Sequence, residues 1–212
     1  MKPPKFLTND VEVLSKTTSH EGYFHLDVYA LRHRRFAGDW GPEIHREIFE
    51  RGHAAAVLPF DPVTGDVIMI EQFRAGAFTA LNSPWLDDDA SPWLYEVVAG
   101  IIDEGEDPTE VVRRECIEET GTPVTDLLPV CHYLVSPGGS SESVFIYVGR
   151  ADTTTVNGVH GLAHEGEDIR PFVVSFEEAY AGIAEGHINN SATIIALQWL
   201  KLNLDDVLAA WR

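Results

Sequence analysis

The amino-acid sequence predicts an α+β protein that begins with an antiparallel β-strand section and continues into a larger domain of strands and helices. Three observations carry this prediction. Residues 1–52 alternate apolar and polar side chains, two strongly apolar runs then flank the turn sequence DPVTGD, and helices with clear ends appear only from residue 108 onward. The order is therefore mixed, with the strands first and the helices interleaved late.

The first predicted domain covers residues 1–52 and the second covers residues 53–212. Strands are expected at 11–14, 23–32 and 43–50, and no convincing helix is found among them. A section of about 50 residues has too little core to be stable alone. We therefore expect it to pack on the rest of the chain or on another subunit.

The second predicted domain opens with a hairpin formed by the runs HAAAVLPF and VIMIEQF. Residues 79–92 contain prolines and three successive aspartates, which predicts a surface loop before a strand at 93–100. Two further strands are expected at 128–135 and 143–148. Ser175 and Glu178 then form a capping-box pattern before a helix that Gly186 ends, and Ser191 opens a second helix.

The composition narrows the class of protein. The chain has 212 residues, of which 44% are hydrophobic, and its 34 acidic residues against 15 Lys and Arg give a net charge of −19. So acidic a surface repels nucleic acid, whereas a small anion can bind where arginines or metal ions supply positive charge. No run approaches the roughly 18 apolar residues of a membrane helix, and the N-terminus lacks the apolar core of a signal peptide. We therefore expect a cytoplasmic protein without membrane association.

The two cysteines, Cys116 and Cys131, both lie within helical or apolar patterns. In such patterns small buried thiols are commoner than disulfides or metal ligands. We therefore expect two buried thiols.

The segment AGIIDEGEDPTEVVRRECIEETG, residues 99–121, carries the most information. Asp107 fits the N-cap of a helix, Pro108 fits its first position, Glu110 is the third-position partner of a capping box, and Gly121 fits the left-handed residue after the end. These signals predict a helix over residues 108–120.

Three carboxylates crowd the last two turns of that helix. Glu115 and Glu119 are four residues apart and share one face, while Glu118 lies three residues from Glu115. They repel one another and face the negative end of the helix dipole, at a cost of about 0.3–1 kcal/mol each. One interpretation is a solvated face on which Glu110, Arg114 and Glu118 form salt bridges. The other is a bound cation, for which hard oxygen ligands favour Mg²⁺ or Mn²⁺ over zinc.

The spacing of these residues resembles the signature of the Nudix hydrolases. The matching positions are Gly100, Glu106, Arg114, Glu115, Glu118, Glu119 and Gly121, while Cys116 and Thr122 depart from the signature only at apolar positions. Most of the chain is similar to the bacterial ADP-ribose pyrophosphatase branch, in the segments EGYFHLDVY, REIFERGHAA, IEQFR, SPGGSSE and HGLAHEGEDI. Pro137 lies 16 residues past Gly121, a placement the family associates with ADP-ribose. The loop at 79–92 is longer than the family pattern.

The resemblance implies an α/β/α sandwich, a mixed sheet flanked by helices, that hydrolyses the pyrophosphate bond of ADP-ribose to AMP and ribose 5-phosphate by metal-activated water. The implied metal ligands are Glu115, Glu119, Glu167 and the backbone carbonyl of Ala99. Glu165 is the implied base, with Glu118 as a second catalytic carboxylate. From the residues alone, Glu165 and Glu167 fit a polar loop equally well.

Substrate contacts are implied in the same way. Arginines offer bidentate donors for phosphate oxygens in a strongly acidic protein, and aromatic residues reach the adenosine, although core packing is the competing interpretation of Phe24. Glu142 is a rival base whose preferred role is a substrate contact. The implied substrate-binding residues are Tyr23, Phe24, Arg46, Glu47, Arg51, Arg74, Ile101, Ser136, Pro137, Gly138 and Glu142.

The family exchanges its N-terminal strands between two subunits, so the resemblance also implies a homodimer with shared active sites. Two other functions stay open. The same chemistry could act on another nucleotide sugar such as GDP-mannose, because the acidic helix contacts only the pyrophosphate. Alternatively, the fold could sense a nucleotide without cutting it, but such a module could lose the helix carboxylates and this sequence keeps them.

Overall fold

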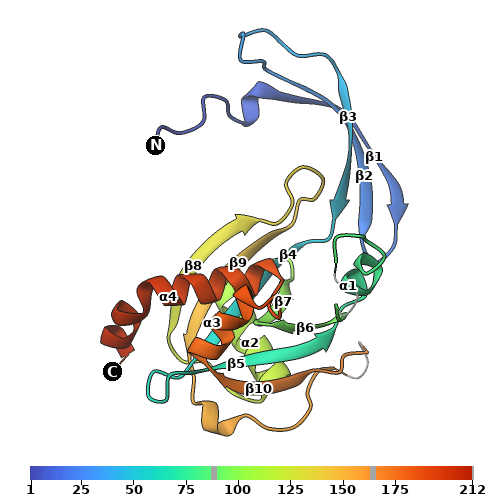
Figure 1. Cartoon of the computed structure of the whole chain (residues 1–212). Helices are drawn as coiled ribbons and strands as arrows, with labels where there is room; N and C mark the ends of the chain where they lie inside the picture. Colours follow the sequence, from blue (N-terminus) through green and yellow to red (C-terminus); the bar gives the residue numbers. More distant parts are fainter. Residues whose placement is uncertain (87–89, 163–165, 212) are drawn as a thin grey trace. The chain divides into compact units, whose positions relative to one another are not determined.

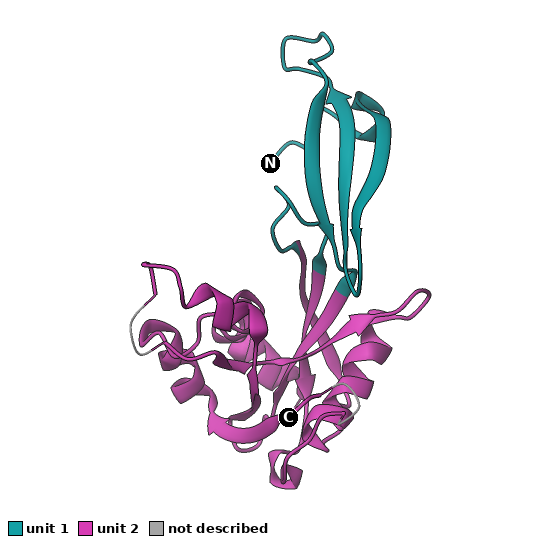
Figure 2. Ribbon diagram, turned by 90° about the vertical axis from the view of Figure 1, so that its right-hand side faces the viewer, with its two compact units in different colours: residues 1–53, 134–143 teal, residues 54–133, 144–212 magenta. Residues whose placement is uncertain are grey.

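The computed structural model describes residues 1–86, 90–162 and 166–211. The chain divides into two compact units, and each is described by itself (Figure 2). Unit 1 comprises Met1–His53 together with Leu134–Ser143, and unit 2 comprises Ala54–Tyr133 together with Val144–Arg212. A segment that lies late in the sequence therefore joins the N-terminal strands.

Unit 1 is built on a three-stranded antiparallel sheet in the order β1-β2-β3, with β1 at Val11–Glu21, β2 at His25–His33 and β3 at Ile44–Glu50. A short 3-10 helix, η1 at Thr8–Asp10, precedes it. The predicted first strand was too short, because β1 continues to Glu21 through the polar sequence SKTTSHE. Almost every residue of β1 is exposed, so this strand has no apolar alternation to reveal it, yet its backbone pairs with β2 throughout.

Unit 2 contains a seven-stranded mixed sheet. Its strands are β4 His53–Phe60, β5 Asp66–Phe73, β6 Trp93–Glu96, β7 Val98–Ile102, β8 Leu127–Leu134, β9 Ser143–Arg150 and β10 Arg170–Ser175. The main order is β10-β5-β4-β9-β8, with β6 paired to β5 and β7 to β4. Strand β4 runs parallel to β9, whereas β6 and β10 run antiparallel to β5. The mixed sheet implied by the sequence is confirmed.

The predicted hairpin is present, but its two strands soon take different partners. Asp61 N–H donates to Asp66 O at 2.9 Å across the turn, and Phe60 pairs with Val67. The predicted single strand at 93–100 is in fact two, β6 pairing with β5 and β7 with β4. The break falls at Val97, whose N–H donates to the hydroxyl of Thr193 at 3.0 Å instead of continuing a sheet.

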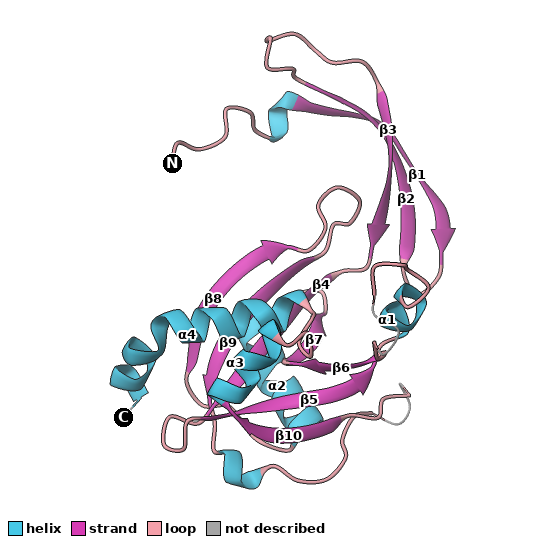
Figure 3. Cartoon of the chain, viewed as in Figure 1, coloured by secondary structure: helices cyan, strands magenta, loops and turns pink. Residues whose placement is uncertain are grey.

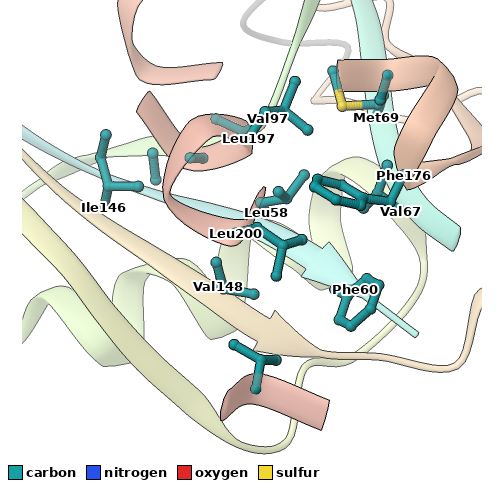
Figure 4. Close-up of a cluster of buried hydrophobic side chains, with 14 of the residues drawn as sticks. Leu58, Phe60, Val67, Met69, Val97, Ile146, Val148, Phe176, Leu197 and Leu200 are labelled. Atoms are coloured by element: carbon teal, nitrogen blue, oxygen red, sulfur yellow. The ribbon is translucent and has the colours of Figure 1, made fainter. Parts of the chain in front are cut away.

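Helices cover both faces of this sheet (Figures 1 and 3). Helix α2, Pro108–Thr120, packs on the face that carries Ala55 and Val57 of β4. Helices α3, Phe176–Ala184, and α4, Ser191–Trp211, pack on the face that carries Leu58 and Phe60 (Figure 4). Burial on both faces explains why β4 and β5 are apolar at nearly every position rather than alternating.

Three smaller features differ from the sequence prediction. A short helix, α1 at Ala75–Ala80, overlaps the start of the loop expected at 79–92, of which residues 87–89 lie outside the described structure. Strand β10 was not predicted, because its alternate side chains are exposed at the sheet edge, and neither was the 3-10 turn η2 at Thr153–Thr155. Cys116 is buried as expected, but Cys131 is exposed. No helix of the described residues is long and apolar enough to cross a lipid bilayer.

Candidate active site

The acidic helix α2 begins and ends at the predicted residues. The Asp107 carboxylate accepts hydrogen bonds from the Thr109 N–H at 2.8 Å and from its hydroxyl at 2.6 Å, and these bonds lower the pKa of Asp107. The cap partner is therefore Thr109, where the sequence pattern had indicated Glu110. Gly121 takes the left-handed conformation, with φ at 69°, and its N–H donates to Ile117 O at 2.9 Å.

Strand β7 and helix α2 lie side by side (Figure 1). The Ala99 N–H donates to Glu119 Oε2 at 3.2 Å, and the Glu119 residue is only 4% exposed. A Cβ built on Gly100 would lie 2.0 Å from Glu115 Oε1, far inside contact distance. A side chain at position 100 would therefore displace the Glu115 carboxyl group, which occupies that space.

The electrostatics of this cluster disfavour ionised carboxylates. Burial raises the pKa of Glu119 well above its ordinary value, and the charges of Glu115 and Glu167 raise it further, against a lowering by Arg74. Burial likewise raises the pKa of Glu115, and Glu118 adds to this effect while Arg114 opposes it. The repulsion expected from the sequence is present, but burial is the larger cause of the raised pKa of both groups.

Arg114 pairs with the outer carboxylates. Its guanidinium lies 2.6 Å from Glu115 Oε1 and 3.4 Å from both Glu118 Oε2 and Glu106 Oε2. Glu106 also accepts from the Asp103 N–H at 3.0 Å, which fastens the loop before the helix. The interpretation of this helix as a salt-bridged face is thus partly correct. Arg114 pairs with Glu118 as expected, and it also pairs with Glu106 and Glu115.

A late loop brings Glu167 to the C-terminal end of α2. The Leu162 N–H donates to Glu167 Oε2 at 3.0 Å, and the Gly161 N–H donates to the Glu118 carbonyl at 3.4 Å. Two backbone hydrogen bonds between His160 and Ile169, at 2.8 and 3.1 Å, close the base of this loop. Glu165, the implied base, lies outside the described residues.

The donor set fits a divalent cation by its chemistry. The described side chains do not form a closed group of three or more potential metal ligands. Glu115, Glu119 and Glu167 nevertheless act on one another electrostatically, and Ala99 contacts Glu119 while Gly100 adjoins Glu115. A hard cation prefers carboxylate and carbonyl oxygens and would relieve the repulsion of buried carboxylates. These residues could therefore hold Mg²⁺ or Mn²⁺.

Unit 1 gathers a second set of predicted residues. Tyr23 and Phe24 meet edge to face at a centroid distance of 4.7 Å, and Phe24 packs similarly on Phe49 at 5.2 Å. The Arg51 guanidinium lies over the Phe24 ring, 5.5 Å from its centroid, and pairs with Glu142 at 3.2 Å. A hollow of about 280 Å³ is lined by His20, Tyr23, Phe24, His25, Leu26 and Phe49.

The loop that carries Ser136, Pro137 and Gly138 also belongs to unit 1. The Phe49 N–H donates to the Gly139 carbonyl at 2.8 Å, which fixes this loop beside the end of β3.

Arg46 and Glu47 are exposed on β3, and the alternation of the strand places Arg46 on the face opposite Phe49. In unit 2, Ile101 is half-buried in β7, and Arg74 directly follows β5 and pairs with Glu96. Sequence reasoning had missed Glu96 and Gln72, although a carboxylate beside apolar strand residues was a usable signal.

The mixed sheet between helices, with an acidic helix packed on a glycine-containing strand, defines a Nudix hydrolase. The chain belongs to this family, whose NUDIX domain model matches residues 50–197. Enzymes of the family in general require divalent metal ions.

Individual relatives are consistent with that family. The ADP-ribose pyrophosphatase of Escherichia coli (strain K12) is 50% identical over 209 residues, which cover 99% of this chain and 96% of the relative. The GDP-mannose pyrophosphatase of Cronobacter sakazakii is 29% identical over 203 residues, covering 91% and 96%. A crystal structure described as an ADP compounds hydrolase matches 96% of this chain and 98% of its own, with a TM-score of 0.69 and 19% identity, a similarity of fold.

Proposed function

We propose that this chain is an ADP-ribose pyrophosphatase that hydrolyses ADP-ribose to AMP and ribose 5-phosphate with Mg²⁺, for which Mn²⁺ can substitute. The observation that carries the proposal is the pair of carboxylates packed against Ala99 and Gly100 in a Nudix chain, the buried Glu119 and the half-buried Glu115. The substrate assignment is supported by 50% identity to an ADP-ribose pyrophosphatase over nearly the whole chain, against 29% to a GDP-mannose pyrophosphatase.

In this proposal Glu115, Glu119, Glu167 and the Ala99 carbonyl hold the cation. When bound, a divalent cation lowers the pKa of a coordinated water and balances the charge of phosphate oxygens. The Ala99 N–H orients Glu119 through its bond to Oε2. Arg114 holds Glu118, the second proposed catalytic carboxylate, and Glu165 is proposed to take the proton from the attacking water.

Unit 1 is proposed to supply contacts to the nucleotide. Phe24 and Tyr23 offer ring faces, and Arg51 offers guanidinium donors. The pairing of Glu142 with Arg51 supports a substrate contact for Glu142 rather than the role of base. We also propose that the substrate is contacted by Arg46, Glu47 and residues 136–138.

We further propose that residues 1–52 form a dimerisation domain that exchanges strands with a second copy of the chain. The support lies in β1, where Val11, Val13 and Leu14 are exposed apolar side chains on a strand with one unpaired edge among the described residues. Sedimentation of the full chain should give twice the monomer mass of 23.5 kDa. A monomer at micromolar concentration would contradict this proposal.

The substrate proposal is tested with a panel of nucleotide sugars in the presence of Mg²⁺. ADP-ribose should give AMP and ribose 5-phosphate with the highest kcat/KM, and a tenfold preference for GDP-mannose would defeat the assignment. Glu119→Gln keeps the shape of the side chain and should abolish turnover without unfolding the protein. If Glu119→Gln retains full activity, the proposed metal site is wrong. If the wild type binds ADP-ribose but cuts no nucleotide sugar, the chain is a sensing module.

A further inference from the structure

The half-buried Glu96, which is itself bonded to the buried Gln72, holds the side chain of Arg74 by one end. Glu96 Oε2 accepts a hydrogen bond from Arg74 Nε at 2.8 Å and another from Gln72 Nε2 at 3.0 Å. The Glu96 side chain is 13% exposed and Gln72 is 6% exposed, whereas the Arg74 side chain is 45% exposed. A single carboxylate oxygen therefore joins a buried amide to an arginine that reaches solvent.

This cluster lies on the face of the sheet that carries the acidic helix. Ile70 of β5 packs in the same core as Val111 and Cys116 of α2. Side chains alternate along a strand, so Gln72 follows Ile70 on that face, and Glu96 is paired directly with Ile70. The charge of Arg74 also acts on Glu119, which places the guanidinium within electrostatic reach of the carboxylate site.

The bond to Glu96 leaves most of the guanidinium donors of Arg74 available. A guanidinium has five N–H donors in a fixed fork, one on Nε and four on the two Nη atoms. Glu96 uses the Nε donor, and no described residue accepts from the Nη atoms of Arg74. The pair of Nη groups is the side of the fork that binds phosphate or carboxylate oxygens bidentately. The side chain is therefore anchored through Nε, with its anion-binding edge unused.

Arg74 lies at the start of the long connection between β5 and β6. Helix α1 begins at the next residue, and the chain returns only at β6. The Arg74 N–H donates to the Pro92 carbonyl at 2.9 Å, and Phe73 pairs with Trp93, so the base of the insertion is closed. Glu96 and Gln72 thus fix the side chain from strands β5 and β6, independently of the insertion.

We propose that Glu96, braced by Gln72, is a positioning residue that orients the guanidinium of Arg74 toward the anionic groups of the substrate. This inference rests on the proposed function, because Arg74 is proposed there as a substrate contact. Glu96 touches neither substrate nor metal in this proposal. It acts by removing the freedom of a long side chain before the substrate binds.

The test is a set of steady-state measurements on the full chain with ADP-ribose and Mg²⁺. Glu96→Gln keeps the shape but removes the charge, and should raise KM about tenfold with kcat changed less than about twofold. The Mg²⁺ concentration for half-maximal rate should stay that of the wild type. Arg74→Ala should raise KM at least as much, and the double variant should be no worse than Arg74→Ala alone, since both substitutions remove one function.

Glu71→Gln is the matched control. Glu71 lies one residue before Gln72 on β5 and pairs with Arg170, so the substitution removes a similar ion pair from the opposite face of the same strand. Its KM should equal that of the wild type. The inference is overturned if Glu96→Gln has a wild-type KM, if its effect adds fully to that of Arg74→Ala, or if Glu71→Gln raises KM equally. A wild type inactive on ADP-ribose would instead defeat the substrate assignment, which the same data reveal separately.

Discussion

Substitution of Gly100 by alanine should remove activity while leaving most of the stability. The new Cβ would lie 2.0 Å from Oε1, 2.2 Å from Cδ and 2.4 Å from Cγ of Glu115. All three are atoms of one side chain, so the clash can be relieved by turning Glu115 away rather than by separating α2 from β7. Overpacking of this kind costs about 1–3 kcal/mol, which corresponds to about 2–4 °C in Tm for each kcal/mol in a chain of this size.

The cost to catalysis should be larger because the displaced group is a proposed metal ligand. A misplacement of about 1 Å in an active site can lower the rate about 100-fold. We therefore expect Gly100→Ala to lower kcat/KM for ADP-ribose by at least that factor. Gly76→Ala is the control, since a Cβ there meets nothing within 4 Å and alanine favours helix α1. Full activity in Gly100→Ala, with an unchanged Mg²⁺ requirement, would refute the assignment of Glu115.

Three further predictions concern ionisable groups. Burial raises the pKa of Cys116 to about 12, so a thiol reagent at pH 8 should titrate one cysteine, the exposed Cys131, in the native protein and two after unfolding; two fast thiols in the native state would contradict this burial. Burial opposes ionisation of Asp61, but hydrogen bonds that include the N–H and hydroxyl of Thr153 lower its pKa. The ionised Asp61 therefore stabilises the fold above the unfolded-state pKa, and this contribution is lost as pH falls through the folded-state pKa. In urea unfolding, Asp61→Asn should lower the free energy of unfolding by about 1–3 kcal/mol at pH 7 and progressively less below about pH 4. Burial and neighbouring carboxylates raise the pKa of Glu119, so in EDTA the Tm should fall as pH rises through that pKa, and Glu119→Gln should remove this dependence in calorimetry.

Helix α2, which holds the proposed metal ligands, could be predicted to the residue because its signals are local. The cap at Asp107, the proline after it and the left-handed Gly121 each act within one turn, so their meaning does not depend on distant parts of the chain. The buried strands β4 and β5 were predictable for a similar reason, since burial on both faces leaves a continuous apolar run.

The features that could not be predicted depend on pairing across long separations. The outer half of β1 is polar on both faces, and its strand conformation is fixed only by hydrogen bonds to β2. The division of the segment 93–102 into two strands depends on Thr193, nearly a hundred residues later. The bracing of Arg74 by Glu96 likewise requires the register of β5 and β6, in which Ile70 faces Glu96. Because a long connection rather than a hairpin turn joins β5 to β6, no turn type in the sequence fixes this register.

The arrangement of the carboxylates also shows which charges on so acidic a helix are paired within the protein. Arg114 lies among Glu106, Glu115 and Glu118, and these charges raise its own pKa although burial works against them. Arg114 thereby balances the charge of the outer carboxylates within the protein. The gain in folding free energy is modest because the pairs are partly exposed. Glu119 has no such partner at hydrogen-bond distance among the described side chains, and the Ala99 N–H alone contacts its carboxylate. Glu119 is thus the most buried of these carboxylates and has no described cationic partner at hydrogen-bond distance, so the proposed cation would relieve most strain at this residue.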